Sequence, residues 1–175
     1  MANLKLSGDT SGVITVAVPA AAGTNTITLP ASTGTVALTS GVGKILQVVH
    51  ATQNTEVLTT STSLVDTGLT ATITPSATSS KIAVWYNVPI LTQANEIVHF
   101  ALIRGSTNIL NNVRALQCNP NGAVNFPANY LDSPSTTSAT TYKVQFGHGS
   151  TPSSGSAVMW NSQSPSQIML MEVAG

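Results

Sequence analysis

Charge is the property that this sequence has least of, and its scarcity limits what the protein can bind. Only 7% of the 175 residues are charged, whereas about 25% is typical of a globular domain. Six basic and six acidic residues give a net charge of zero, and the basic residues are scattered singly. No Lys or Arg cluster could therefore follow a phosphate backbone, so nucleic acid is not an expected partner. A surface with so little charge suits a protein that works inside an assembly.

Cysteines and long apolar runs are also scarce. Cys118 is the single cysteine, so no disulfide can form within the chain. No apolar run approaches the ~18 residues that a membrane-spanning helix needs, which argues against membrane insertion. The N-terminus lacks the apolar core of a signal peptide, so we expect the protein to be made and assembled in a cytoplasm. Its stability must then come from burial, within one chain or between chains.

The residue types that carry chemistry are few and form no recognisable motif. No pair among His50, His99 and His148 has metal-ligand spacing, and no nucleophile elbow, phosphate-binding loop or dinucleotide fingerprint is present. Asp66 and Asp132 could meet across a cleft, as the carboxyl groups of a glycosidase do, but nothing around them singles them out. We therefore predict a protein without catalytic residues, metal or cofactor, and keep a glycan-cleaving enzyme as a distant alternative.

What the sequence does contain is a series of strand patterns. Residues 81–90 alternate with the period of two that is typical of a strand. Residues 97–103 form a second apolar run, which also fits one helical face, although the flanking patterns favour a strand. Further strands are predicted at residues 44–51, 56–60, 63–65, 68–74, 107–110, 141–146, 156–160 and 167–173. Short strands with polar turns between them predict an all-β protein, an antiparallel β-sandwich of the jelly-roll type.

The first 40 residues differ in composition from the rest. Three short strand-like runs, at 13–18, 25–29 and 34–38, contain no aromatic residue and are separated by Pro-Ala turns. Such small side chains could hardly bury enough surface to fold alone. We therefore predict that residues 1–43 form an extended arm and residues 44–175 a β-sandwich head, although the runs could also be the first strands of the sandwich. The apolar residues of the arm are predicted to provide attachment: Ile14, Val16, Ile27, Leu29 and Val36.

Residues 106–141 read as a long irregular region, rich in Asn, Pro and Ser. A loop region of this length in a compact domain indicates function or contact with a partner. Tyr130 and Asp132 lie within it, and His148 lies between two glycines, which is typical of a loop tip. These three residues are the predicted contacts with a receptor.

The large aromatic residues on predicted strands are expected in the core or in a subunit interface. Arg104 closes an apolar strand, and its side chain could pair with Glu172 or Glu96. The predicted interface residues are Trp85, Tyr86, Arg104 and Tyr142.

Several segments resemble one family. The stretch from Ser11-Gly12-Val13-Ile14-Thr15-Val16 to Thr33-Gly34-Thr35-Val36 is similar to the N-terminal segment of bacteriophage fibre proteins. Ile73-Thr74-Pro75-Ser76, Leu102-Ile103-Arg104-Gly105 and Met169-Leu170-Met171-Glu172-Val173 resemble the heads of these proteins. The resemblance leaves out residues 111–140 and contains no catalytic motif. It implies a homotrimeric virion appendage, with heads similar to the jelly rolls of the tumour-necrosis-factor and complement type.

Two placements on a virion fit this resemblance, because the arm leads to the head without a shaft. In the first, the protein is a short tail fibre whose arm docks on other virion proteins and whose head contacts a host surface glycan or protein. In the second, it is a decoration or cement protein that stabilises the capsid. Both put the assembled trimer on the virion surface.

Overall fold

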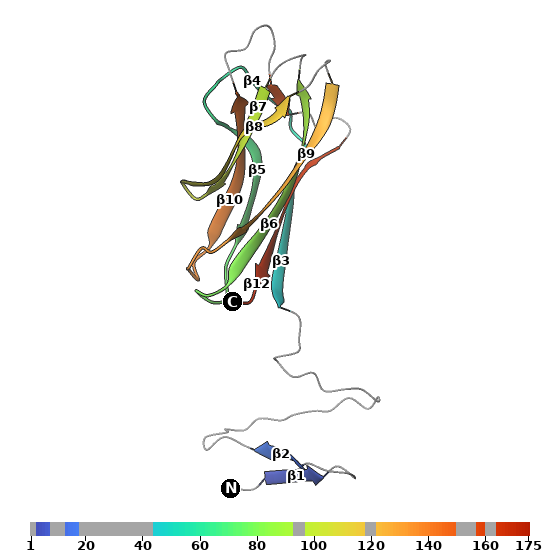
Figure 1. The fold of residues 1–175 in the computed structure, drawn as a ribbon, viewed down its shortest axis with the longest axis vertical. Helices are drawn as coiled ribbons and strands as arrows, with labels where there is room; N and C mark the ends of the chain where they lie inside the picture. The colour runs from blue at the N-terminus through green and yellow to red at the C-terminus, as the bar shows by residue number, and fades with distance from the viewer. Residues whose placement is uncertain are drawn as a thin grey trace. The chain divides into compact units, whose positions relative to one another are not determined.

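The computed structural model of the chain describes residues 3–7, 13–17, 44–92, 97–117, 122–149, 157–159 and 164–175 (Figure 1). Every regular element in these residues is a β-strand, and they include no helix long and apolar enough to cross a membrane. By its internal contacts the chain divides into two units, Met1–Val42 and Gly43–Gly175.

The first unit contains one described pair of strands. β1 (Asn3–Ser7) and β2 (Val13–Ala17) pair antiparallel, with Asn3 opposite Ala17. The strand pattern at 13–18 predicted β2, whereas β1 was not predicted. The other two strand-like runs, at 25–29 and 34–38, lie outside the described residues, and the role of this unit as an arm stays a prediction.

The second unit is a sandwich of two antiparallel sheets. The first sheet has the order β5-β10-β7-β8 and consists of β5 (Val65–Ile73), β10 (Thr140–His148), β7 (Ile97–Arg104) and β8 (Thr107–Gln117). β7 and β8 are joined by a tight hairpin turn in which Gly105 has φ 58°. A positive φ at this position is available to glycine without strain.

The second sheet is built around β6 (Lys81–Thr92). β9 (Gly122–Asp132) pairs with one side of β6, β12 (Ser166–Val173) with the other, and β3 (Ile45–Gln53) with the far side of β12. Two short strands extend the sheet beyond the end of β12: β11 (Ala157–Met159), which pairs with β6, and β4 (Val57–Thr59), which pairs with β11.

The chain crosses between the sheets in the jelly-roll manner. β3 lies in the second sheet, β5 in the first, β6 in the second, β7 and β8 in the first, β9 in the second, β10 in the first and β12 in the second. The predicted fold class, an all-β antiparallel sandwich of the jelly-roll type, is confirmed. Residues Ile97–Arg104 form a strand, so the helical alternative for this run is wrong.

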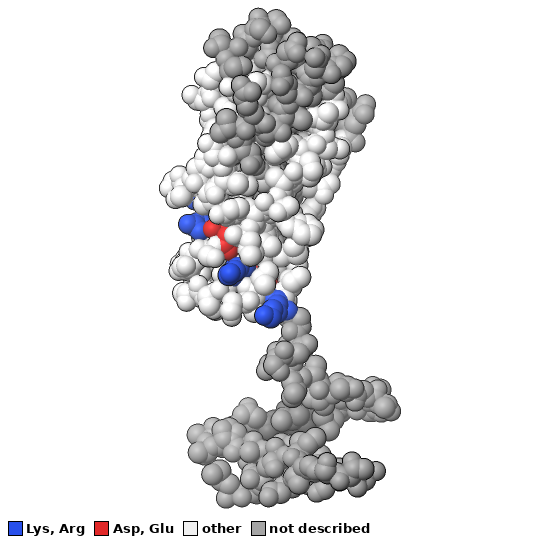
Figure 2. Space-filling model, in the orientation of Figure 1, with Lys and Arg blue, Asp and Glu red and all other residues white. Residues whose placement is uncertain are grey.

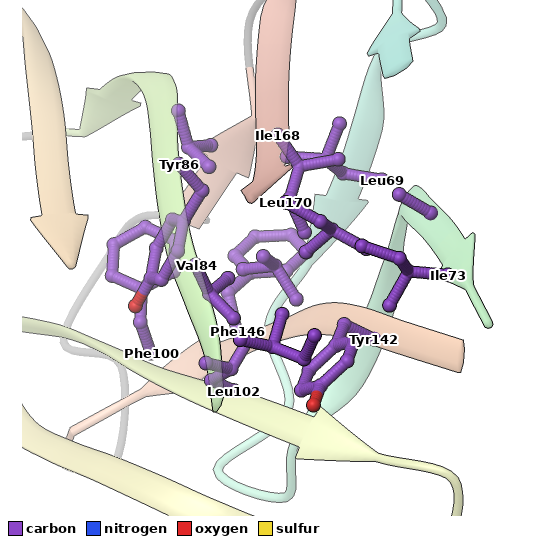
Figure 3. Close-up of a cluster of buried hydrophobic side chains, with 14 of the residues drawn as sticks. Leu69, Ile73, Val84, Tyr86, Phe100, Leu102, Tyr142, Phe146, Ile168 and Leu170 are labelled. Atoms are coloured by element: carbon purple, nitrogen blue, oxygen red, sulfur yellow. The ribbon is translucent and has the colours of Figure 1, made fainter. Parts of the chain in front are cut away.

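The core fills the space between the sheets with alternate residues of each strand (Figure 3). Val84 of β6 lies opposite Leu170 of β12 in the second sheet, and both are fully buried. Phe100 of β7 stacks on Phe126 of β9 across the sandwich, with ring centroids 4.5 Å apart. Such contacts make the burial of apolar surface between the sheets the main stabilising term.

The prediction of an irregular region at 106–141 was wrong. Most of it forms β8 and β9. Between β9 and β10, residues 133–139 form a loop. In β9 the half-buried Phe126, Ala128 and Tyr130 alternate with exposed residues, which are Asn, Pro, Asn and Leu from 125 to 131. The alternation was hidden because Asn and Pro, which are typical of turns, occupy the outer positions.

Prolines are tolerated in these strands because of where they fall. Pro127 lies in β9, which among the described strands pairs only with β6 and is therefore an edge strand. Pro89 lies in the central strand β6, between the last residue paired with β12, Asn87, and the first paired with β11, Ile90. A missing N–H at these two positions interrupts little of the ladder.

Candidate functional site

On the outer face of the sheet β5-β10-β7-β8, β5 and β10 carry polar side chains that are paired with one another, whereas the outward Ala101 and Ile103 of β7 are buried. The Thr72 and Thr141 hydroxyls are 2.8 Å apart on neighbouring strands. Asp66 accepts a hydrogen bond from Gln145 at 2.7 Å and forms a 3.0 Å ion pair with Lys143. These two donors lower the pKa of the Asp66 carboxyl, the Gln145 bond most. This face is therefore suited to contact with water.

Part of the outer face of the other sheet is apolar. One row across it consists of Val48 on β3, Met171 on β12, Ala83 on β6 and Leu131 on β9, which lie opposite one another. Val48 and Leu131 are each 55% exposed. Ile45 and Leu46, at the start of β3, are also exposed, beside a bulge in the pairing of β3 with β12. We call this set the apolar band: Ile45, Leu46, Val48, Ala83, Leu131 and Met171.

A shallow hollow of about 410 Å³ lies on the same face, further along the strands. At its centre is Trp85, which is 54% exposed and lies opposite Met169 on β12 and Asn129 on β9. The next row holds Gln167, Asn87 and Pro127. We call it the Trp85 hollow, and its lining is His50, Trp85, Tyr86, Asn87, Pro127, Ala128, Asn129, Gln167 and Met169.

Charged groups are sparse on the head. Figure 2 shows one face on which the charged side chains gather towards one end, whereas the rest of the described surface in view is uncharged. None of the residues that line the Trp85 hollow or form the apolar band is Asp, Glu, Lys or Arg.

A cluster of three polar side chains links the two sheets. Arg104 on β7 donates to both carboxylate oxygens of Asp132 on β9 at 2.8 Å, and the Tyr142 hydroxyl on β10 donates to the same carboxylate at 2.6 Å. Asp132 and Tyr142 are buried. Burial, followed by the hydrogen bond to Asp132, raises the pKa of Tyr142 far above its usual range. The partner of Arg104 is therefore Asp132, not Glu172 as predicted; Glu96 lies outside the described residues.

Glu172 forms a second buried cluster. Its carboxylate accepts bonds from the Ser76 N–H at 2.7 Å, the Ser76 hydroxyl at 2.6 Å and the Gln47 amide at 2.6 Å. Burial alone would raise the pKa of Glu172, but the hydrogen bonds from Ser76 and Gln47 outweigh it and bring this pKa to about 2. The cluster ties the segment between β5 and β6 to β3 and β12.

The prediction that His148, between two glycines, lies at a loop tip was wrong. His148 is the last residue of β10 and is fully buried, and its N–H donates to the Ser61 carbonyl at 2.8 Å. His99 lies nearby on β7 and is half-buried. Its pKa is lowered, mainly by burial and further by the charge of His148. Glycine flanks His148 because the space beside Gly147 is already filled by His99.

Comparison with known proteins finds no match to a family model and no match among curated proteins. Among solved structures, infectious bursal virus-derived T=1 particles share 10% identity with a TM-score of 0.45, over 97% of this chain and 44% of that chain. The structure of the Gx strain of infectious bursal disease virus shares 13% identity with a TM-score of 0.46, over 97% of this chain and 45% of that chain. The VP2 subviral particle of that virus shares 10% identity with a TM-score of 0.44, over 85% of this chain and 42% of that chain. The chain spans less than half the length of each of these proteins.

The predicted site residues fall into different environments. Trp85 is exposed and Arg104 is half-buried, but the side chains of Tyr86 and Tyr142 are enclosed in the core and present no surface to a partner. Ile14 and Val16 lie on β2, and the predicted attachment residues Ile27, Leu29 and Val36 lie outside the described residues.

The predicted receptor contacts are not a surface cluster. Asp132 and His148 are buried, and Tyr130 is half-buried and packs against the core. Sequence reasoning missed the exposed residues of β9, Asn129 and Leu131. The sequence did contain a sign of them, because they alternate with the inward Phe126, Ala128 and Tyr130. The segment was interpreted as a loop, so this alternation was overlooked.

The groups that could do chemistry are already engaged. Within the described residues, no three side chains of His, Cys, Asp or Glu are grouped so that they could hold a metal ion. Asp66, Asp132 and Glu172 each accept hydrogen bonds from neighbouring side chains of the sandwich. Asp66 and Asp132, which could have faced each other across a cleft, bind other partners instead: Asp66 binds Gln145 and Lys143, and Asp132 binds Arg104 and Tyr142. Cys118 lies outside the described residues.

Proposed function

We propose that this protein is a non-enzymatic structural protein of a virion, which assembles as a homotrimer through the apolar band. The observation that carries the proposal is the inequality of the two outer faces of the sandwich. One carries paired polar side chains on β5 and β10, while the other exposes a row of aliphatic side chains.

An aliphatic row of this kind needs a cover. Isolated exposed apolar residues are ordinary, but a contiguous exposed patch marks an interaction site. The band runs across four strands, a width of roughly 15–20 Å at the usual strand spacing. Subunit interfaces are depleted of charge at their centre, as this band is. The partner that matches a chain so poor in charge is a second copy of the same chain.

The structural role is supported by how the buried carboxylates are used. A glycosidase needs one carboxyl group that can give up a proton to the leaving group and a second that faces it across a cleft. Asp132 is ion-paired to Arg104 and bonded to Tyr142, and the pKa of Glu172 is held at about 2. Both carboxylates are therefore assigned to stabilising the sandwich and not to binding or cleaving a substrate.

The virion assignment rests on the resemblance of the sequence to phage fibre proteins. In this proposal residues 1–43 attach the trimer to other virion proteins, and the head faces the outside, where it contacts the host. Ile14, Val16, Ile27, Leu29 and Val36 are the attachment residues. Decoration of the capsid is the second candidate, because a head with no shaft would also suit a protein that covers a flat lattice.

Immunogold labelling and copy counting on purified particles test this function. The proposal expects label at the tail and, at most, a few tens of copies per particle. Hundreds of copies spread over the capsid would favour decoration. Absence of the protein from particles that contain every other structural protein would contradict both placements.

A further inference from the structure

We propose that the Trp85 hollow is a binding site for a neutral sugar ring, so that the head recognises an uncharged glycan. This inference rests on the proposed function, since it names the class of host ligand that the head contacts. It replaces Tyr130, Asp132 and His148 as the contact surface, because two of these three side chains are buried.

The centre of the site is an aromatic surface that the fold itself does not use. Trp85 is on the central strand of its sheet, yet 54% of it is exposed, on the side away from the core. The indole ring offers a broad apolar surface with one N–H donor at its edge. The C–H face of a pyranose ring is a matching surface, since it is flat, weakly polar and surrounded by hydroxyls.

Three amide side chains lie beside this aromatic surface, where they could reach the hydroxyls of a ring stacked on it. Asn129 lies directly opposite Trp85 on β9, and Asn87 and Gln167 lie opposite each other in the next row. Among the residues that the structure describes, none of these three amides has a hydrogen bond to another protein group. An amide both donates and accepts, as a hydroxyl does, so each amide can engage one or two hydroxyls of the ring.

The charge of the site selects for a neutral ligand. The lining contains no Asp, Glu, Lys or Arg, and the single imidazole, His50, lies opposite Met169 at its edge. A carboxylated or sulfated sugar would lose water at its anion without finding a cation in return. The volume of about 410 Å³ falls within the range of small-ligand sites, roughly 300–1,000 Å³.

The hollow and the apolar band are neighbours with different chemistry. The band presents Val48 and Leu131 in an aliphatic row, whereas the hollow presents three amides around one aromatic ring. A second copy would cover aliphatic residues well, but it would leave the amides in need of polar partners. We therefore assign the band to assembly and the hollow to the glycan, and the experiment separates the two.

Saturation-transfer difference NMR on the full chain provides the test, with neutral trisaccharides of glucose, mannose, galactose and N-acetylglucosamine as probes. At least one probe is expected to receive saturation at its ring protons. Trp85→Ala should abolish the signal, Trp85→Phe should retain part of it, and Asn129→Ala should weaken binding roughly tenfold, the effect of losing about 1.4 kcal/mol. Asn54→Ala, which changes an exposed asparagine elsewhere on the head, is the matched control and should bind as the unaltered chain does.

The molar mass of each variant is measured alongside. The inference requires that Trp85→Ala keeps the mass of the unaltered assembly while it loses the sugar. It is overturned if no probe binds, if binding survives Trp85→Ala, or if Trp85→Ala breaks the assembly, since the hollow would then be a subunit contact. The last result would leave the proposed assembly standing, whereas a monomeric unaltered chain that still binds sugar would contradict the assembly alone.

Discussion

Asp132 and Glu172 are carboxylates in the interior of a sandwich that is otherwise mostly apolar. Each joins segments that are distant in the sequence: Asp132 joins β9 to β7 and β10, and Glu172 joins β12 to β3 and the segment before β6. A buried carboxylate costs free energy unless it is fully hydrogen-bonded. Removal of one partner should therefore be more damaging than removal of an exposed ion pair.

The Asp132 cluster gives the first prediction. Tyr142→Phe removes the hydroxyl that donates to Asp132 and should lower the free energy of unfolding by about 1–2 kcal/mol. Arg104→Ala should cost more, about 2–4 kcal/mol, because it leaves the buried carboxylate without its cation. Lys143→Ala, which breaks the exposed pair with Asp66, should cost less than about 1 kcal/mol. Urea unfolding of the three variants measures these values, and equal losses for Arg104→Ala and Lys143→Ala would contradict the assignment.

Glu172 gives a prediction about pH. Its pKa is about 2 in the folded protein and near 4.5 in the unfolded chain. Because the folded value is the lower one, the ionised carboxylate stabilises the fold above about pH 4.5, and this stabilisation is lost as the pH falls towards 2. Glu172→Gln should therefore be less stable than the unaltered protein at pH 7 and should lose less stability on acidification.

Thermal unfolding between pH 7 and pH 2 measures this difference. Glu56→Gln changes an exposed residue and serves as the control, with an acid limb like that of the unaltered protein. If the melting temperatures of Glu172→Gln and the unaltered protein fell equally from pH 7 to pH 2, the Glu172 hydrogen bonds would not set its pKa.

At the scale of elements, the strands that the sequence predicted best are the ones buried on their inner face with bulky residues. β6 and β12 alternate cleanly because their inner residues from 82 to 90 and from 168 to 170 are Ile, Val, Leu or Tyr. β8 was predicted only over residues 107–110, and β9 was missed because its outer positions carry Asn and Pro, which resemble turn residues when the neighbouring strand is unknown. The period of two was present in β9, but its inner residues include the small Ala128.

The site was less predictable than the fold, for a physical reason. The partner of Arg104 depends on which strand lies across the sandwich, and that follows from the topology of the whole head, not from neighbours in sequence. Likewise, Trp85 and Tyr86 are adjacent aromatic residues, and only the direction of the pleat decides that one is exposed and the other is in the core.

The end of β10 provides a prediction at this scale. A Cβ atom at Gly147 would lie 2.8 Å from Nε2 of His99 and 3.0 Å from the Ser63 carbonyl oxygen. Gly147→Ala should therefore lower the free energy of unfolding by about 1–3 kcal/mol through overpacking. In the His99→Ala background the cost should fall, because one of the two contacts is removed. Calorimetric melting of the single and double variants measures this coupling, and strictly additive losses would refute it.

At the scale of the whole molecule, the unequal outer faces of the sandwich link the sequence to the proposed function. A chain with 7% charged residues cannot protect two sheet faces with charge. Threonine and a small ion-pair network cover part of one face, and in the proposed function assembly covers the apolar band of the other. In the proposed assembly, the Trp85 hollow on the same face stays available to a ligand.

The molar mass of the purified chain in solution tests this account most directly. Light scattering at micromolar concentration should give three times the chain mass of 17.9 kDa. Val48→Asp and Leu131→Asp place a charge in the apolar band and should give monomers, whereas Thr72→Asp, the same kind of change on the polar face, should leave the trimer intact. A monomeric unaltered chain, or trimers that persist in both band variants, would contradict assembly through this face.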